Sequence, residues 1–293
     1  MPKNFWIYKR LPPHPFSTTV ISNAVVLASL QSKGFPKPST NDFYLVADHP
    51  ANYPGTIPEI FSITPKTGTI LYGLPHPGTN TSDIPADKIL VQRAWTCAAQ
   101  LGVDATRIAF KEMTSHFNQD ENGNDITNQP CSRGVFLSRL LDEISFTDIG
   151  DDGANGGFWI EFGSHGQVRG FSLVWPDLKR SELQPTASPQ QIIACIRAFK
   201  TMSPPIGQET HYFTRLKTLA QAKKLTITKI TPAYMEGIYG DMTESSDPSK
   251  FIAPFAELEA IADFGNSNMP VRLLSPILSS EVGRLLTEKS RSH

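Results

Sequence analysis

The spacing of apolar residues along the chain predicts several amphipathic helices. Apolar side chains recur every three or four residues, which places them on one face of a helix. We expect helices over 17–32, 85–101, 188–200 and 210–220. Gly34 and Gly102 are the expected ends of the first two, because glycine readily adopts the left-handed conformation that closes a helix. Ser188 and Gln191 form a capping-box pattern at the start of the third.

Alternating apolar and polar positions between these helices predict strands and tight hairpins. The clearest hairpin runs from 158–162 through Gly163-Ser-His-Gly166 to 168–175. Alternation puts Phe158, Ile160 and Phe162 on one face of it. Trp159 and Glu161 then lie on the other face. Further strands are expected over 43–47, 57–63, 69–72, 107–117, 134–141, 225–230, 255–264 and 271–274.

The order of these elements predicts an internal repeat. A helix followed by strands and a hairpin occurs around residues 17–73, 88–176 and 210–278. Two copies are clear and the N-terminal copy is weaker, so we expect an α+β fold of tandem units, each with a helix on an antiparallel sheet. The predicted units are 1–80, 81–205 and 206–293. The proline-rich segments 10–15 and 204–208 are further expected boundaries.

Composition and charge narrow the functional classes. The chain has 293 residues, 27 Lys and Arg against 28 Asp and Glu, and no basic run. The basic surface that nucleic-acid binding requires is therefore not predicted. No apolar stretch reaches the roughly 18 residues that a spanning helix needs, so we expect no membrane span.

The three cysteines, Cys97, Cys131 and Cys195, are too few and too widely spaced for a disulfide framework. Cys97 and Cys195 fall within predicted helices at or near apolar positions. We therefore interpret them as buried free thiols, with a disulfide involving Cys131 as the alternative.

The sequence carries no specific catalytic or metal-binding motif. Its seven histidines are scattered, and the segment 118–129 lacks the acidic first and twelfth ligands of a calcium loop. Glu257, Glu259 and Asp263 alternate along one strand, which is typical of a solvent-facing sheet surface with Arg272 opposite. We therefore expect no metal, no cofactor and no catalytic residues.

Aromatic residues in strands or at strand ends are the better functional lead. Some of them must be core, and those on an outward sheet face favour a partner surface. They are Trp6, Tyr8, Trp159, Trp175, Tyr234 and Tyr239.

The second copy resembles a PepSY-type unit. The matching segments are Val135-Phe-Leu-Ser-Arg139, Asp142-Glu-Ile144 and the hairpin from Trp159 to Val168 that closes on Trp175. Residues 60–73 resemble the same hairpin. Such units occur in protease propeptides and extracytoplasmic regulatory proteins, where they bind and restrain a partner. The resemblance implies no catalytic residues.

These observations predict a non-catalytic, secreted or periplasmic protein that binds a protein partner, for example a protease or an envelope protein. The expected binding residues are Trp159, Glu161, His165 and Trp175. Two alternatives stay open: a hydrolase with a carboxylate and histidine site between units, and a binder of carbohydrate or another small ligand. A second layer over the Trp159 face, such as the helix 188–200, is also open at this point.

Overall fold

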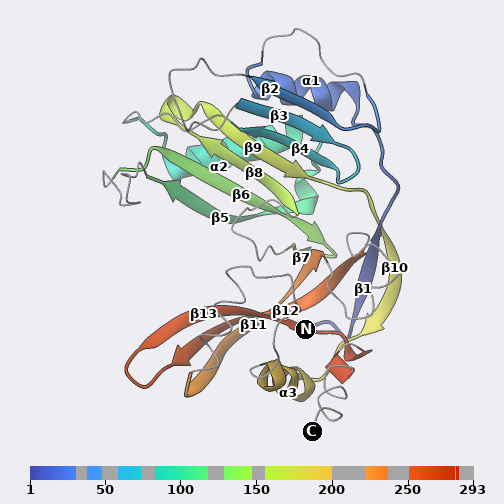
Figure 1. Cartoon of the computed structure of the whole chain (residues 1–293), viewed down its shortest axis with the longest axis vertical. Coiled ribbons are helices and arrows are strands. Elements are labelled where there is room, and N and C mark those ends of the chain that lie inside the picture. The colour runs from blue at the N-terminus through green and yellow to red at the C-terminus, as the bar shows by residue number, and fades with distance from the viewer. Residues whose placement is uncertain are drawn as a thin grey trace. The chain divides into compact units, whose positions relative to one another are not determined.

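The computed structural model describes residues 1–30, 38–47, 59–73, 83–117, 129–146, 156–199, 222–236, 251–280 and 282–283. Within these ranges lie three α-helices and two antiparallel sheets, so the fold is α+β as predicted (Figure 1). The predicted helix 210–220, the calcium-like segment up to residue 128 and Tyr239 fall outside the described residues.

Contacts divide the chain into two units, each of which we describe by itself. The central unit comprises Leu11–Phe146 and Asp152–Asp177, and the terminal unit comprises Met1–Arg10, Thr147–Asp151 and Leu178–His293. The first border, after Arg10, falls at the proline-rich segment predicted as a boundary. The division into 1–80, 81–205 and 206–293 stays a prediction.

The central unit contains one sheet of seven successive strands. Their order is β2 (Phe43–Ala47), β3 (Glu59–Thr64), β4 (Thr69–Gly73), β9 (Val168–Val174), β8 (Gly157–Phe162), β6 (Ser132–Leu141) and β5 (Ile108–His116). The two-residue β7 (Ile144–Ser145) pairs with β6. The pairing of β4 with β9 joins the first and second predicted copies edge to edge, so these two copies share a sheet and do not form separate ones.

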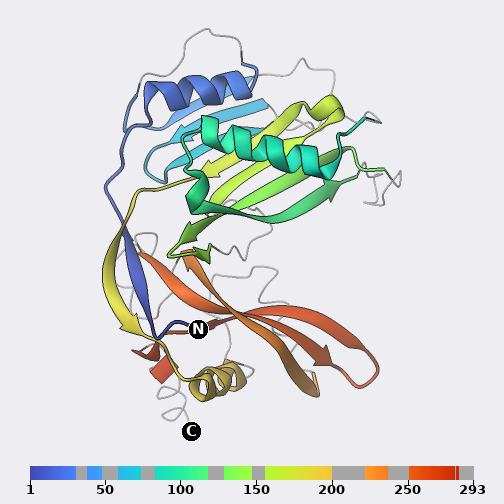
Figure 2. The same ribbon diagram turned by 180° about the vertical axis from the view of Figure 1, so that it is seen from behind.

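Helices α1 (Thr18–Leu27) and α2 (Asp87–Gln100) lie on the same face of this sheet (Figure 2). Their buried stripes contain Ile21, Ala24 and Val25 in α1, and Leu90, Ala94, Cys97 and Ala98 in α2. These side chains join the inward residues of the strands, including Phe158, Ile160 and Phe162, in one hydrophobic core. The helical stripes predicted from the sequence therefore point to the core, because their burial removes apolar surface from water.

Each helix of the central unit is closed by a residue in the left-handed conformation, but the two residues are of different types. Gly102 (φ 82°) closes α2 as predicted, with Val103 N–H bonded to the Ala98 carbonyl at 3.1 Å. Ser29 (φ 55°) takes the same left-handed role after α1, with Leu30 N–H donating to the Val25 carbonyl at 3.1 Å. The prediction that α1 continues to Gly34 is therefore wrong.

The terminal unit holds the second sheet, in the order β10 (Leu178–Pro185), β1 (Asn4–Arg10), β12 (Phe251–Asp263) and β11 (Lys224–Glu236). Strand β13 (Asn268–Pro276) also pairs with β12, and α3 (Pro189–Phe199) lies against β13. The predicted capping box is present. Ser188 N–H donates to Gln191 Oε1 at 2.9 Å, and Gln191 N–H donates to Ser188 Oγ at 3.2 Å.

Two aromatic residues that were candidates for a partner surface belong to the core of the terminal unit. Tyr8 is 7% exposed and Tyr234 is fully buried. Their rings meet edge to face at 5.4 Å, and the Tyr234 hydroxyl donates to the Trp6 carbonyl at 3.0 Å. Burial therefore satisfies both the ring and the hydroxyl of Tyr234.

All three cysteines are buried and none forms a disulfide, as predicted for Cys97 and Cys195. Burial raises the pKa of the Cys97 thiol, an effect that nearby Arg93 opposes. Cys131 also holds no disulfide, and its thiol donates to the His116 carbonyl at 3.3 Å.

Candidate binding face

The candidate site lies on the outer face of the central sheet, by which we mean the face opposite α1 and α2. Figure 2 shows both helices on one side of the strands, and no described helix of the central unit lies over the other side. Side chains on the outer face alternate along each strand with those of the hydrophobic core.

A row of side chains crosses the outer face perpendicular to the strands. Consecutive members are paired between neighbouring strands: Tyr44, Ser62, Leu71, Ser172, Trp159 and Phe136. We call these six residues the aromatic row. Tyr44 is 62% exposed, Leu71 is 38% exposed and Trp159 is half-buried. The two serines between these larger side chains are buried, and so is Phe136 at the end of the row, so its exposed apolar groups are Tyr44, Leu71 and part of Trp159.

The register directly beside the aromatic row contains three glycines. Gly73, Gly170, Glu161 and Gly134 are paired in sequence from β4 to β6, and we call them the glycine row. A Cβ atom on Gly134 would lie 2.8 Å from Trp159 Nε1, and one on Gly170 would lie 3.4 Å from Trp159 Cζ3. The indole therefore reaches over both strands that flank β8. Glycine is needed at Gly134 because a side chain there would occupy the space of the indole.

Glu161 is the charged member of the glycine row and is only 6% exposed. Ser132, which is completely buried, donates its hydroxyl to Glu161 Oε1. No ion pair between Glu161 and a lysine, arginine or histidine is found among the described residues. Burying a carboxylate without a cationic partner is costly, so this arrangement is a marked electrostatic feature of the face.

Of the four predicted binding residues, only Trp159 and Glu161 share the outer face. His165 lies in the turn after β8 with φ 53°, and its backbone N–H donates to the Asp83 carbonyl at 2.7 Å. Its imidazole Nε2 is 3.9 Å from an Asp83 carboxylate oxygen. The turn is therefore tied to the segment that precedes α2.

Trp175 packs against the hydrophobic core on the helix side of the sheet. The guanidinium of buried Arg139 lies 4.4 Å from the centre of its ring, and Arg139 Nη1 donates to the Pro176 carbonyl at 2.7 Å. Trp175 therefore anchors an internal cation–π contact and does not extend the outer face.

Sequence reasoning missed Tyr44, Leu71 and the glycine row as members of this face. The segment Thr69-Ile-Leu-Tyr72 has three consecutive apolar residues, which hides the outward position of Leu71. The sequence signal available for the glycine row was glycine within a strand, since it often marks close approach of another group.

The described residues contain no group of three or more His, Cys, Asp or Glu side chains placed to hold a metal ion. No helix within the same part of the chain is long and apolar enough to cross a membrane.

Comparisons with known proteins add little at the level of sequence. No protein-family model matches the chain, and no curated protein sequence matches it. Among solved structures, the chain is similar to the C-terminal domain of YpeB from Bacillus megaterium, with 10% sequence identity and a TM-score of 0.36. That similarity covers 90% of this chain and 94% of the other. The PepSY-type resemblance of residues 135–175 stays a prediction.

Proposed function

We propose that this chain is a non-catalytic binding or regulatory protein and that the outer face of the central sheet receives a protein partner. The observation that carries the proposal is the aromatic row, with Tyr44, Leu71 and Trp159 aligned across strands β2, β4 and β8. Aligned, partly exposed apolar side chains on a sheet face are typical of interaction surfaces, in which large aromatic residues supply much of the binding energy.

The polar residues of the face support binding over hydrolysis. Ser132 is opposite His116 in the register of β6 and β5, a combination that also occurs in nucleophilic catalysis. Its hydroxyl donates to Glu161, however, and has no exposed surface on which a substrate carbonyl could be attacked. A serine activated as a nucleophile instead donates to a histidine and is open to the substrate.

The partner class and the cellular location belong to the same proposal. The resemblance of the second copy to PepSY-type units supports a protease or envelope protein as partner and a periplasmic or secreted location. Fractionation of cells that produce the native full-length protein tests the location.

The test of function is a comparison of two double variants. Tyr44→Ser with Leu71→Ser removes the two most exposed apolar side chains of the aromatic row. Val26→Ser with Ile89→Ser removes comparable apolar surface from α1 and α2, where Val26 is 72% exposed and Ile89 is 51% exposed. Both variants should fold, because surface substitutions change stability by only about 0.5 kcal/mol or less.

We expect the wild type and the Val26 and Ile89 double variant to capture the same protein from native extract. The Tyr44 and Leu71 double variant should capture at least about tenfold less of that protein. Trp159→Ala should also reduce capture. Lower stability with unchanged capture would identify Trp159 as a structural residue only. Equal capture by both double variants would contradict the proposal, and selective loss of binding to a glycan array would favour a carbohydrate ligand.

A further inference from the structure

We propose that the outer face recognises an arginine side chain of its partner, with the guanidinium stacked on the Trp159 indole and paired with the Glu161 carboxylate. This inference rests on the proposed function and specifies the chemistry of the partner. It is argued from three features of the central unit: a buried carboxylate, an indole beside it and the open surface at Gly73.

The first feature is the unbalanced charge of Glu161. Glu161 is 6% exposed, and among the described residues its carboxylate receives one neutral hydrogen bond, from Ser132. A carboxylate offers about four acceptor positions, so one hydroxyl leaves most of its capacity unused. An arriving cation would supply both the missing hydrogen bonds and the missing charge.

The second feature is the way in which this chain uses its tryptophans. Arg139 lies over Trp175 at 4.4 Å, and Arg180 lies over Trp6 at 5.5 Å. No such cation lies over the ring of Trp159 in the part of the chain that the structure describes. Trp95 likewise has no cation over its ring among these described contacts, and Trp159 differs from it in lying beside the buried carboxylate of Glu161, which an arriving cation could also bind.

Arginine fits these two groups better than lysine does. Its planar guanidinium can stack on an aromatic ring while its N–H groups bond a carboxylate in two parallel hydrogen bonds. The ammonium group of lysine is a strongly hydrated point charge and gains less from the flat indole.

The third feature is the open surface at Gly73. The Trp159 indole, joined at Gly134 by the Thr114 hydroxyl, occupies the space over Gly134 and Gly170, and Gly73 is the next position along the row. A Cβ atom added to Gly73 would meet nothing within 4 Å. A partner backbone can therefore approach the sheet closely at Gly73, beside the indole of Trp159.

A pair of matched peptides tests the inference on the full chain. The first is acetyl-Ser-Val-Arg-Val-Ser-amide, and the second replaces arginine by citrulline, which keeps the shape and loses the charge. Binding is followed by nuclear magnetic resonance of the four indole N–H groups, with the Trp159 signal assigned from the Trp159→Phe variant. We expect the arginine peptide to shift the Trp159 signal and to bind about tenfold more tightly than the citrulline peptide.

Three variants locate the effect. Glu161→Gln keeps an acceptor for Ser132 and should abolish the preference for arginine. Ser132→Ala leaves the carboxylate in place and should retain the preference, which keeps the test decisive if Glu161→Gln folds poorly. Glu259→Gln removes an exposed carboxylate of the terminal unit and should change nothing.

Equal binding of the two peptides to the wild type overturns the inference, as does an unmoved Trp159 signal or a preference that survives in Glu161→Gln. A lysine peptide that binds with the same affinity as the arginine peptide would show that the face recognises any cation, which would also contradict the inference. If these results occur while the Tyr44 and Leu71 double variant still loses its captured partner, the arginine inference fails and the proposed function stands.

Discussion

The two sheets of this chain each carry an outward strand face, and the two faces are built differently. On β12 three of the outward positions, Glu257, Glu259 and Asp263, are acidic, with the exposed Ile261 among them, and the neighbouring strands place basic residues in register with Glu259 and Asp263. Glu259 pairs in register with Lys229 on one side and Arg272 on the other, and Asp263 pairs with Lys224. On the central sheet, the outer positions form the aromatic and glycine rows.

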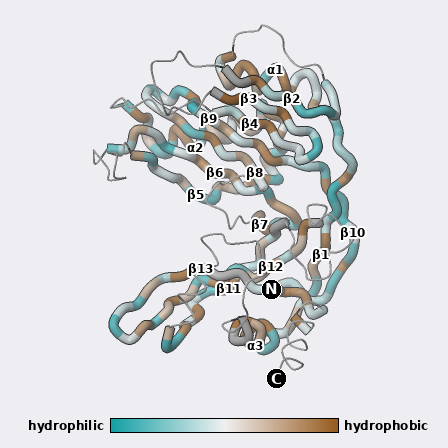
Figure 3. The backbone as a smooth tube through the Cα atoms, viewed as in Figure 1, coloured by the Kyte–Doolittle hydropathy of each residue, from teal (hydrophilic) through white to brown (hydrophobic). Residues whose placement is uncertain are grey.

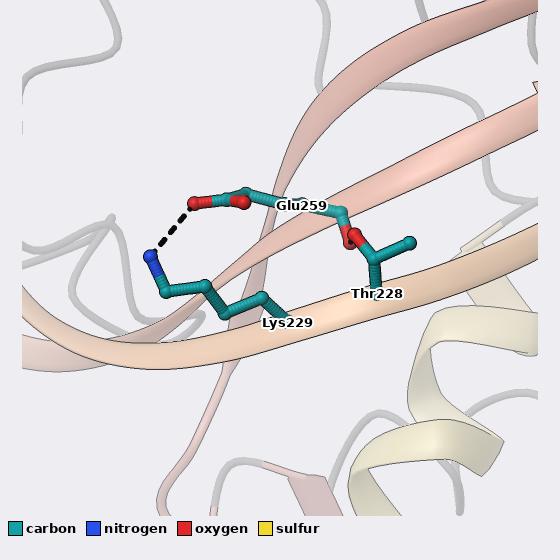
Figure 4. A network of polar contacts seen from close by, with 3 residues as sticks. All are labelled: Thr228, Lys229 and Glu259. Atoms are coloured by element: carbon teal, nitrogen blue, oxygen red, sulfur yellow. Dashed lines mark hydrogen bonds and ion pairs between the residues drawn. The ribbon is translucent and has the colours of Figure 1, made fainter.

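The β12 face shows what a merely solvated surface looks like in this protein. Lys229 Nζ lies 3.0 Å from Glu259 Oε1, and the Thr228 hydroxyl donates to the Glu259 carbonyl at 3.0 Å (Figure 4). Hydrophilic residues recur along β11 and β13 (Figure 3). Opposite charges across strands give solubility at little cost. The central sheet places a buried, unbalanced carboxylate among apolar residues instead, which argues for a different use of that face.

The largest effect is expected from a charge on the helix side of the central sheet. Ala94 on α2 is fully buried in the core, so Ala94→Asp should cost several kcal/mol of unfolding free energy. Urea denaturation measures the loss, with Gln92→Asp, an exposed position of the same helix, as control. A small effect of Ala94→Asp would mean that α2 does not cover the sheet, and the distinction between the helix side and the outer face would fail.

A smaller effect should separate two positions of the glycine row. Gly134→Ala would place a Cβ atom 2.8 Å from Trp159 Nε1 and closer still to Thr114 Oγ1, and should cost about 1–3 kcal/mol through overpacking. Gly73→Ala meets open space and should change the free energy of unfolding by no more than about 1 kcal/mol, in the stabilising direction if at all. Thermal unfolding of both variants compares them. Equal stability would show that the packing of Trp159 and Thr114 over Gly134 does not depend on the missing side chain.

Local features of the fold could be predicted from the sequence because they depend on neighbouring residues. The capping box of Ser188 and Gln191, the end of α2 at Gly102 and the hairpin of β8 and β9 all follow from short-range patterns. Ser29 is the exception. A serine in the left-handed conformation ends α1, and no pattern distinguishes it from a serine that continues the helix.

The candidate site could be predicted only in part because it depends on register between distant segments. The outward direction of Trp159 follows from alternation along one strand. The position of Leu71, the next large side chain along the aromatic row, depends on the pairing of β4 with β9, about a hundred residues apart in the chain, which no local pattern encodes. Trp175 was assigned to the same site because its stacking partner, Arg139, could not be seen in the sequence.

The smallest effect is expected on the β12 face. Glu259→Gln removes the ion pair with Lys229, but both side chains are more than half exposed, so the pair is screened by water and should contribute about 0.5 kcal/mol or less. High salt should remove even this difference, because at about 1 M salt the Debye length falls to about 3 Å. Urea denaturation of the wild type and Glu259→Gln at low and high salt measures it, and Lys229→Met tests the same pair from the other strand. A loss of several kcal/mol would mean that the β12 face is a structural charge network. The contrast with the outer face of the central sheet would then no longer be one between a solvated surface and a binding surface.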